Sequence, residues 1–594
     1  MNKESYLLLI ALLIVISISA VSSYMILSFD GEDVSNSSFK ADLFFENGAI
    51  YSVDENDTIA EVLAVKDGKI VFVGSAEEGK SYKESAKEIV DLQGGMLLPG
   101  FIDGHIHTIS PDFFDFVLLE DTDVDSVLKT IADFVEANPN QDVYYGFGVN
   151  VGLFEGDELT NGPKKERLDE ISQDKPIIIY ALDGHSVWLN SKGFEYSNIS
   201  KNTSAPIGGE IVKNNKTGEL WGSVRDSAMA LVPDPNLSED KLSTALQNFQ
   251  SNLNSLGYTS IMTLPGNGYL DVPWEGYHKL EQEGLLNLRV RGANILKPWD
   301  IENDIAKIEE LKAKYNSDML KLIAAKVFTD GILAGESAYL LKPYNNTTNE
   351  YGEGIWTQEA LNDVFLSLNK KGIQAHTHSI GDAAVRMALD AAEYSKNNGP
   401  DLNSRNAITH LQLVDENDFS RFKELNVVPV VQTFWHFKQP GAWEQIEYPV
   451  LGERANNEWP LRSFVDNGAM LTFSSDYPVT NVPNPFYAIE IAVTRNLPDG
   501  PAYGVPENIT DIDDPKYLLW AEERLDIKNA IRGYTINAAY SIFEEDNIGT
   551  LEVGKSADLI VIDQNLLSID PLKISDTKIL RTYLNGKLVY SLPS

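Results

Sequence analysis

One stretch of this chain constrains its fold more than any other: a short apolar run that ends in two histidines. Residues 96–104 read MLLPGFIDG, and His105-Ile106-His107 follows directly. Residues i and i+2 of a strand point to the same face. The two imidazoles can therefore converge on one metal ion. The pair alone is a modest signal, because two histidines on a surface or in a core also fall two apart by chance.

Four further strand-like runs carry metal-binding residue types at or near their ends. They hold Lys326 (residues 322–328), His376 and His378 (374–378), His410 (406–410) and Asp476 (469–476). A lysine inside an apolar segment is costly unless it is paired or chemically altered. Imidazole, carboxylate and amine groups that end several strands indicate one shared metal centre.

Helical patterns separate these runs. Their spacing predicts helices over residues 124–137, 244–256, 302–315, 358–371, 382–396, 416–425 and 527–543. Strands that alternate with helices predict βα units and a parallel barrel, whose functional residues lie at the C-terminal rim. The predicted fold class is therefore α/β, a (β/α)8 TIM-like barrel.

Both ends of the chain differ from this pattern. They predict short strands separated by Asn, Asp and Gly, with a hairpin at Asn585-Gly586. We interpret the ends as one small β-sandwich that flanks the barrel, and a central stretch that fits no single βα unit as an insertion over the rim. The predicted division is β-sandwich at residues 41–97 and 548–594, barrel at 98–547 and insertion at about 140–240.

The first 40 residues predict a membrane segment and a linker. Residues 6–27 form an uncharged apolar run, long enough to span a ~30 Å hydrocarbon core at ~1.5 Å per residue. Lys3 precedes the run and acidic residues follow it, which predicts a single-pass protein with its barrel outside the cytoplasm. We assign 1–28 to this transmembrane helix and 29–40 to a polar linker. A cleaved signal and a secreted protein are the alternative.

Composition excludes several classes of function. The net charge is −40, from 88 acidic and 48 basic residues, which disfavours binding to nucleic acid or to an anionic membrane surface. The chain has no cysteine, so thiolate metal sites, disulfides and cysteine nucleophiles are excluded. Assembly into a homo-oligomer stays open.

Taken together, the motifs resemble the amidohydrolase superfamily, and within it the amidohydrolase 3 branch of YtcJ-like and N-substituted formamide deformylase-like proteins. The order His-x-His, Lys, His, His, Asp is the order of that superfamily along its barrel. The resemblance covers residues 41–594 through the strings LLPGFIDGHIH, KVFTDG, HTHSIGDAAVRMALDA, ITHLQLVDENDFSRF, FSSDYPV, DGHSVWLNS, AVTRN and GTLEVGKSADLIVID. No single string is specific, but the set is.

The resemblance implies one or two divalent ions, with zinc the expected metal. The implied metal ligands are His105, His107 and Asp476 for one ion, His378 and His410 for a second, and Lys326 as a bridge after its amine reacts with carbon dioxide. An unmodified Lys326 paired with Asp330 is the alternative, and it favours a single metal. Asp476 is also the implied catalytic residue, taking a proton from the attacking water and passing it to the leaving group. The alternative for Asp476 is a structural turn before Pro478.

Five further residues are candidates for the substrate pocket. They are His185, Asp330, His376, Gln432 and His436. His376 shares a strand face with His378 and is either an outer group or a substrate contact. A loop position is the alternative for His185, and core packing is the alternative for the aromatic residues beside His436.

These implications predict a metal-dependent hydrolase of a non-peptide C–N bond in a small amide, N-formyl or cyclic amide substrate. A metal ion at such a site lowers the pKa of water from ~15.7 to about 7, which supplies hydroxide at neutral pH. The alternatives are an esterase, a non-hydrolytic isomerase or hydratase on the same centre, and a metal-free binding protein. The complete ligand set argues against the last.

Overall fold

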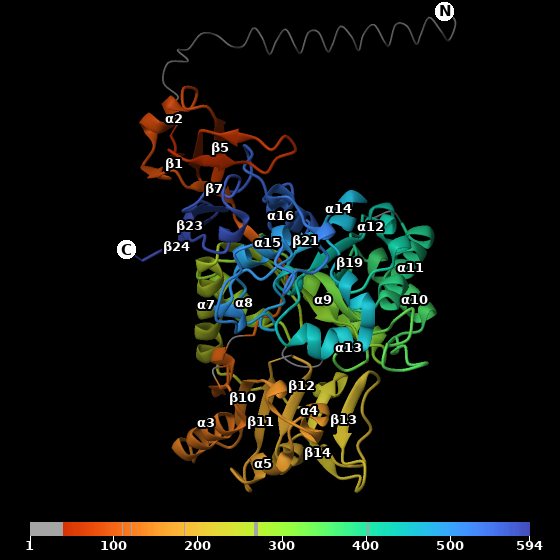
Figure 1. Cartoon of the computed structure of the whole chain (residues 1–594). Coiled ribbons are helices and arrows are strands. Elements are labelled where there is room, and N and C mark those ends of the chain that lie inside the picture. The colour runs from red at the N-terminus through yellow and green to blue at the C-terminus, as the bar shows by residue number, and fades with distance from the viewer. Residues whose placement is uncertain are drawn as a thin grey trace, which may run out of the picture.

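The computed structural model describes residues 40–109, 111–119, 121–182, 184–266, 271–400 and 403–593. Figure 1 shows a central barrel, with the sheets formed by the two chain ends on one side and a separate sheet, in orange and yellow, on the opposite side. No helix within these ranges is long and apolar enough to cross a membrane. The predicted transmembrane run at residues 6–27 lies outside them.

The barrel is an eight-stranded sheet in the order β21-β20-β19-β18-β17-β16-β15-β8, with parallel neighbours throughout. The strands are β8 (Phe101–Ile106), β15 (Tyr258–Thr263), β16 (Arg289–Ile295), β17 (Leu320–Phe328), β18 (Gln374–Ser379), β19 (Ala407–His410), β20 (Val428–Val431) and β21 (Thr472–Phe473). Backbone bonds just beyond β21 draw its end to β8: the Asp476 amide donates to the His105 carbonyl at 2.9 Å, and the His107 amide to the Tyr477 carbonyl at 2.9 Å. The predicted TIM-like barrel is confirmed.

Helices follow the barrel strands largely where the amphipathic spacing predicts them. The longer ones are α7 (Glu239–Ser255), α8 (Trp274–Gln282), α9 (Ile301–Lys314), α10 (Gln358–Lys370), α11 (Asp382–Asn398), α12 (Phe419–Leu425), α15 (Pro485–Thr494), α16 (Ile527–Tyr534) and α17 (Ile536–Ser541). The single helix predicted over residues 527–543 is wrong, because the chain breaks at Thr535, where φ is −122° and ψ is −101°. The Thr535 hydroxyl donates to the Ile531 carbonyl at 2.8 Å, a local bond that competes with the helical pattern.

The insertion forms a six-stranded sheet in the order β13-β14-β12-β11-β10-β9. Its strands are β9 (Phe116–Val117), β10 (Tyr144–Val149), β11 (Ile177–Ala181), β12 (Ser186–Leu189), β13 (Gly209–Lys213) and β14 (Leu220–Asp226). Helix α3 (Val124–Ala137) packs its buried Val127 and Ile131 in the same cluster as Tyr144. The insertion was predicted to start at about residue 140, but it starts earlier, with β9 and α3. Helix α3 packs on this sheet and not on the barrel. Amphipathic spacing shows that a helix has a buried face but not which sheet it covers.

The chain ends build two sheets, with strand orders β5-β4-β1-β6 and β24-β23-β22-β7-β2-β3, so residues from both ends share the second. The strands are β1 (Leu43–Glu46), β2 (Ala49–Tyr51), β3 (Ile59–Ala60), β4 (Val62–Lys66), β5 (Lys69–Gly74), β6 (Glu88–Asp91), β7 (Met96–Pro99), β22 (Leu559–Ile562), β23 (Ile579–Leu584) and β24 (Lys587–Ser591). The hairpin turn at Asn585 (φ 49°) and Gly586 (φ 72°) has two left-handed residues, as a two-residue type I′ turn requires. The apolar run before His105 thus divides at Gly100 between two sheets.

A buried ion pair joins the segment after α17 to the barrel. Glu544 accepts from Arg291 at 2.7 Å and from Lys321 at 3.0 Å, and the side chains of Arg291 and Glu544 are almost fully buried. Burial alone would raise the pKa of Glu544, but the charge and hydrogen bond of Arg291, together with the hydrogen bonds from Asn547 and Lys321, outweigh burial and lower this pKa from 4.5 to about 2. The carboxylate therefore stabilises the fold while it is charged.

Glu544→Gln is expected to lower the free energy of unfolding by about 3–5 kcal/mol at neutral pH, because it leaves the Arg291 charge buried without its partner. Since the folded pKa lies below the unfolded one, the contribution of the wild-type carboxylate is complete above the unfolded pKa of 4.5 and is lost as the pH falls toward about 2. Urea denaturation across this range checks it. Asp133→Asn, at an exposed pair with Lys129, should change little; equal effects would contradict the account.

Candidate metal centre

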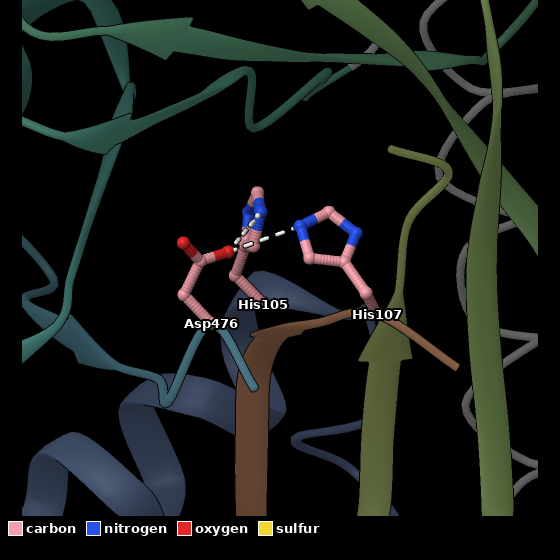
Figure 2. A group of neighbouring side chains, drawn as sticks. All are labelled: His105, His107 and Asp476. Atoms are coloured by element: carbon pink, nitrogen blue, oxygen red, sulfur yellow. Dashed lines mark ion pairs between the residues drawn. The ribbon is translucent and has the colours of Figure 1, made fainter. Parts of the chain in front are cut away.

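Three side chains converge at the rim of the barrel, where β8 ends beside the segment after β21. The Nε2 atom of His105 lies 3.2 Å from Oδ1 of Asp476, and that of His107 lies 3.1 Å from the same oxygen. Figure 2 shows the two imidazoles and the carboxylate pointing toward one another. The candidate ligand atoms of the three residues all lie within 4.8 Å of one another, and all three residues are buried.

Backbone geometry holds this cluster in place. Asp476 adopts a left-handed conformation with φ 56°, which is uncommon for a residue other than glycine. Buried Asp103 accepts from the backbone amides of His105 at 3.2 Å and Ser475 at 3.0 Å. The first and last strands of the barrel are therefore joined through one carboxylate directly beneath the cluster.

The contacts of His107 test whether a cation fits. Its Nδ1 lies 2.9 Å from the Leu264 carbonyl oxygen, which can only accept, so Nδ1 donates and Nε2 faces the cluster. Oδ1 of Asp476, 3.1 Å from this Nε2, is a buried oxygen that makes no hydrogen bond to the described residues. A cation held between these atoms would satisfy it.

The spacing and chemistry of these atoms also fit a metal. Two atoms that each bind zinc at ~2.0–2.1 Å with tetrahedral angles lie roughly 3.4 Å apart, close to the 3.1 and 3.2 Å observed here. Burial keeps the pKa of His105 well below its ordinary value, so its imidazole is neutral, as a metal ligand must be. Two imidazole nitrogens and one carboxylate oxygen form a donor set that zinc accepts.

His378 and His410 lie together beside this cluster, with ring centroids 4.5 Å apart. Nδ1 of His410 donates to Oε1 of Gln432 at 2.9 Å, and the Gln432 amide is itself oriented by donating to Thr409 and Ser474. This leaves the Nε2 lone pair of His410 for a ligand. Nε2 of His378 donates to the Gly331 carbonyl at 3.2 Å, which leaves its Nδ1. Gln432 therefore orients a candidate ligand from behind.

Lys326 points into the same centre. Its Nζ atom lies 3.4 Å from Nε2 of His105 and 4.7 Å from the ring centroid of Phe328. Burial lowers the pKa of Lys326 to about 7, so much of the amine is neutral at physiological pH, and the neutral amine is the form that reacts with carbon dioxide. The alternative pairing with Asp330 is wrong, because no ion pair joins these two described residues.

Asp330 holds loops together. Its carboxylate accepts from the backbone amides of Tyr339 at 2.9 Å, Ile380 at 3.0 Å and Gly381 at 2.9 Å. The residue is 1% exposed, so its carboxylate is turned away from solvent. The structure therefore places Asp330 beneath the loops after β17 and β18, and not on the wall of an open substrate pocket.

The other pocket candidates fall in different places. Nε2 of His376 lies 3.0 Å from Nδ1 of His105, so His376 contacts a candidate ligand. His436 is fully buried and stacks on Trp459 with ring centroids 5.2 Å apart. His185 comes from the insertion, and its ring centroid lies 6.2 Å from that of His378.

Three residues of the site were not predicted from the sequence. Asp103 shares the strand face of His105, so the period of two was a signal that could have found it. Phe328 ends β17 two residues after Lys326 and packs its ring 5.1 Å from that of His378. Asp226 bonds to His185 at 2.7 Å, but it lies 41 residues away along the chain and only the strand pairing brings it close.

Comparison with known proteins agrees with this arrangement. The family model described as amidohydrolase family matches residues 88–590. The putative amidohydrolase YtcJ of Bacillus subtilis (strain 168) is 27% identical, over 92% of this chain and 99% of its own. N-substituted formamide deformylase of Arthrobacter pascens is 24% identical, over 92% of this chain and 98% of its own. An uncharacterized metal-dependent hydrolase from Pyrococcus horikoshii OT3 has the same fold, with a TM-score of 0.66, 23% identity and coverage of 89% of this chain and 99% of that one.

The fold is a parallel barrel with a candidate metal centre of two histidines and one aspartate at its rim. The chain belongs to the amidohydrolase family. The resemblance to YtcJ-like and N-substituted formamide deformylase-like proteins is thereby confirmed.

Proposed function

We propose that this protein hydrolyses a non-peptide C–N bond of a small amide, N-formyl or cyclic amide. The observation that carries the proposal is the convergence of the ligand atoms of His105, His107 and Asp476, buried together at the barrel rim. The similarity to an N-substituted formamide deformylase supports the bond type. When bound, a divalent ion such as zinc supplies hydroxide from water and polarises a carbonyl group.

The residues of the chain carry the proton transfers. The Asp476 carboxylate takes one proton from the attacking water and delivers it to the leaving nitrogen as the C–N bond breaks, so R–CO–NH–R′ and water become R–COOH and H2N–R′. His376 contacts the imidazole of His105 and Gln432 that of His410, and these contacts fix the orientation of the two rings. A carboxylated Lys326, between the two groups of ligands, would allow two ions, and an unmodified one favours a single ion.

A panel of paired substrates tests the reaction class. The full-length protein, expressed with zinc, is assayed against N-alkylformamides, N-acyl amines and cyclic amides, each beside the ester of the same acyl group. We expect turnover of at least one amide class that Asp476→Asn removes. Turnover of esters alone would show that the protein is an esterase and not an amidase. If the metal-loaded protein hydrolyses neither member of any pair, the proposal is contradicted.

Removal of the metal is expected to abolish this turnover. Dialysis against a chelator removes the ion from His105, His107 and Asp476, and added zinc should restore activity in proportion to the zinc bound, because the ion supplies the nucleophile. Elemental analysis and rate measurements on the same samples check the proportion. Full activity in protein with less than about a tenth of an ion per chain would refute metal dependence.

We further propose that residues 6–27 anchor the chain, with the barrel outside the cytoplasmic membrane. The support is the uncharged run and the acidic residues that follow it. Protease added to intact cells or spheroplasts should digest the barrel. Digestion only after lysis would place it inside, and a soluble form that begins near the end of the run would indicate a cleaved signal.

A further inference from the structure

A fully buried arginine holds the backbone of the loop between β20 and β21. Arg495 directly follows α15 and is 0% exposed. Its Nη1 donates to the Trp459 carbonyl at 2.8 Å, its Nη2 to the Glu458 carbonyl at 3.1 Å and its Nε to the Leu519 carbonyl at 3.0 Å. No ion pair joins its guanidinium to a described carboxylate. All three nitrogens of this side chain therefore hold backbone carbonyls.

The loop held in this way is strained at Trp459. The backbone of this residue is left-handed, with φ 62°, which is an outlier for a bulky side chain. Such a conformation persists only where the surrounding structure over-determines it. The Trp459 amide donates to the Gln412 carbonyl at 2.9 Å, and the Gln412 side chain donates to Oε1 of Glu458 at 2.5 Å. Gln412 and Arg495 therefore hold the amide and the carbonyl of the strained residue.

Two tryptophan rings connect this strained residue to the candidate metal centre. Trp459 contacts Trp435 edge to face, with ring centroids 5.7 Å apart. Trp435 in turn stacks on His410, with centroids 6.0 Å apart and 18° between the planes. Trp435 is partly exposed, whereas its neighbours Phe434 and His436 are buried. Trp459 and Trp435, here called the tryptophan pair, thus link the held loop to a candidate ligand.

Two contacts then determine the orientation of the His410 ring. Gln432 bonds to its edge, at Nδ1, and Trp435 covers one of its faces. A hydrogen bond at one atom leaves a ring free to tilt about that bond. Offset stacking at centroid separations of about 4.5–7 Å is favourable, so the indole opposes this tilt. The edge and face contacts together therefore direct Nε2 of His410.

We propose that Arg495 is a positioning residue for His410, acting through the tryptophan pair, and that it thereby tightens the binding of a second divalent ion at His378 and His410. The inference rests on the metal centre of the proposed function and names what orients one of its ligands. Arg495 bonds to no candidate ligand, so its effect reaches the centre only through the loop that it holds.

Metal titration of the full-length protein tests the proposal without a substrate. Metal-free protein is titrated with zinc in the presence of bicarbonate, and the bound ions are counted by calorimetry and elemental analysis. We expect two ions in the wild-type protein, with the weaker one lost in His410→Ala. Arg495→Met removes the donors of the side chain. It should raise the Kd of the weaker ion at least tenfold, as changes to the partners of ligands typically do, and that of the other ion less than twofold.

Three further variants separate positioning from a general loss of stability. Arg495→Lys can still donate to a carbonyl, but without the fork of a guanidinium, and should recover part of the affinity. Trp435→Leu leaves every bond of Arg495 in place and should weaken the same ion. Arg291→Met is the matched control, because Arg291 is equally buried but donates to the Asp318 carbonyl just before β17. It should lower the melting temperature and leave the ratio of the two Kd values unchanged.

Three results would overturn the proposal. A wild-type protein that binds only one ion has no second site to position. Equal weakening of both ions in Arg495→Met, or an unchanged second ion in Trp435→Leu, would make Arg495 a purely structural residue. The outcome is separate from that of the proposed function. A protein that binds two ions as expected here, but hydrolyses no amide, upholds this inference and contradicts amide hydrolysis.

Discussion

Replacing His105 and His107 together by alanine is expected to remove both the bound metal and all measurable turnover. The two imidazoles supply two of the three ligand atoms within 4.8 Å of one another, and Asp476 alone cannot hold a divalent ion in their place. The expected loss of activity is complete, because the ion supplies the nucleophile. Zinc content by elemental analysis and turnover of the best substrate from the panel check it.

The double variant needs a control for folding, since both histidines are buried. Its melting temperature should be compared with that of metal-free wild-type protein, which lacks the same stabilising ion. His278→Ala, on the outer helix α8, should keep metal and activity. A double variant that folds and retains wild-type turnover would show that the site lies elsewhere.

Asp476→Asn is expected to keep most of the metal and to lower kcat by about 10²–10⁴-fold. The amide oxygen can still lie near Nε2 of His105 and His107, but it cannot take a proton from water or give one to the leaving nitrogen. Metal content and single-turnover rates on the same preparation separate the two effects. A variant with bound metal and wild-type turnover would rule out the proton shuttle.

The sequence predicted the barrel and its ligand positions because both depend on short-range patterns. A period of two places His105 and His107 on one face of the chain, and a parallel barrel brings its strand ends to one rim. His378, His410 and Lys326 were located in the same way. The resemblance to known strings then ordered them into one centre.

Contacts between distant segments could not be predicted in this way. The spacing of α3 shows a buried face, but only the fold shows that it covers the insertion sheet. A pair between Lys326 and Asp330, four residues apart, was the alternative to a carboxylated Lys326, yet the Asp330 carboxylate accepts from three backbone amides. The bond between His185 and Asp226 follows from strand pairing that no local pattern reveals.

The central claim is that His105, His107 and Asp476 hold a metal ion, and anomalous diffraction tests it most directly. Crystals of the full-length protein expressed with zinc would be measured on both sides of the zinc absorption edge. The account predicts a peak about 2.0–2.2 Å from Nε2 of His105, Nε2 of His107 and a carboxylate oxygen of Asp476. Density for a water molecule with no anomalous signal between these three atoms would contradict it.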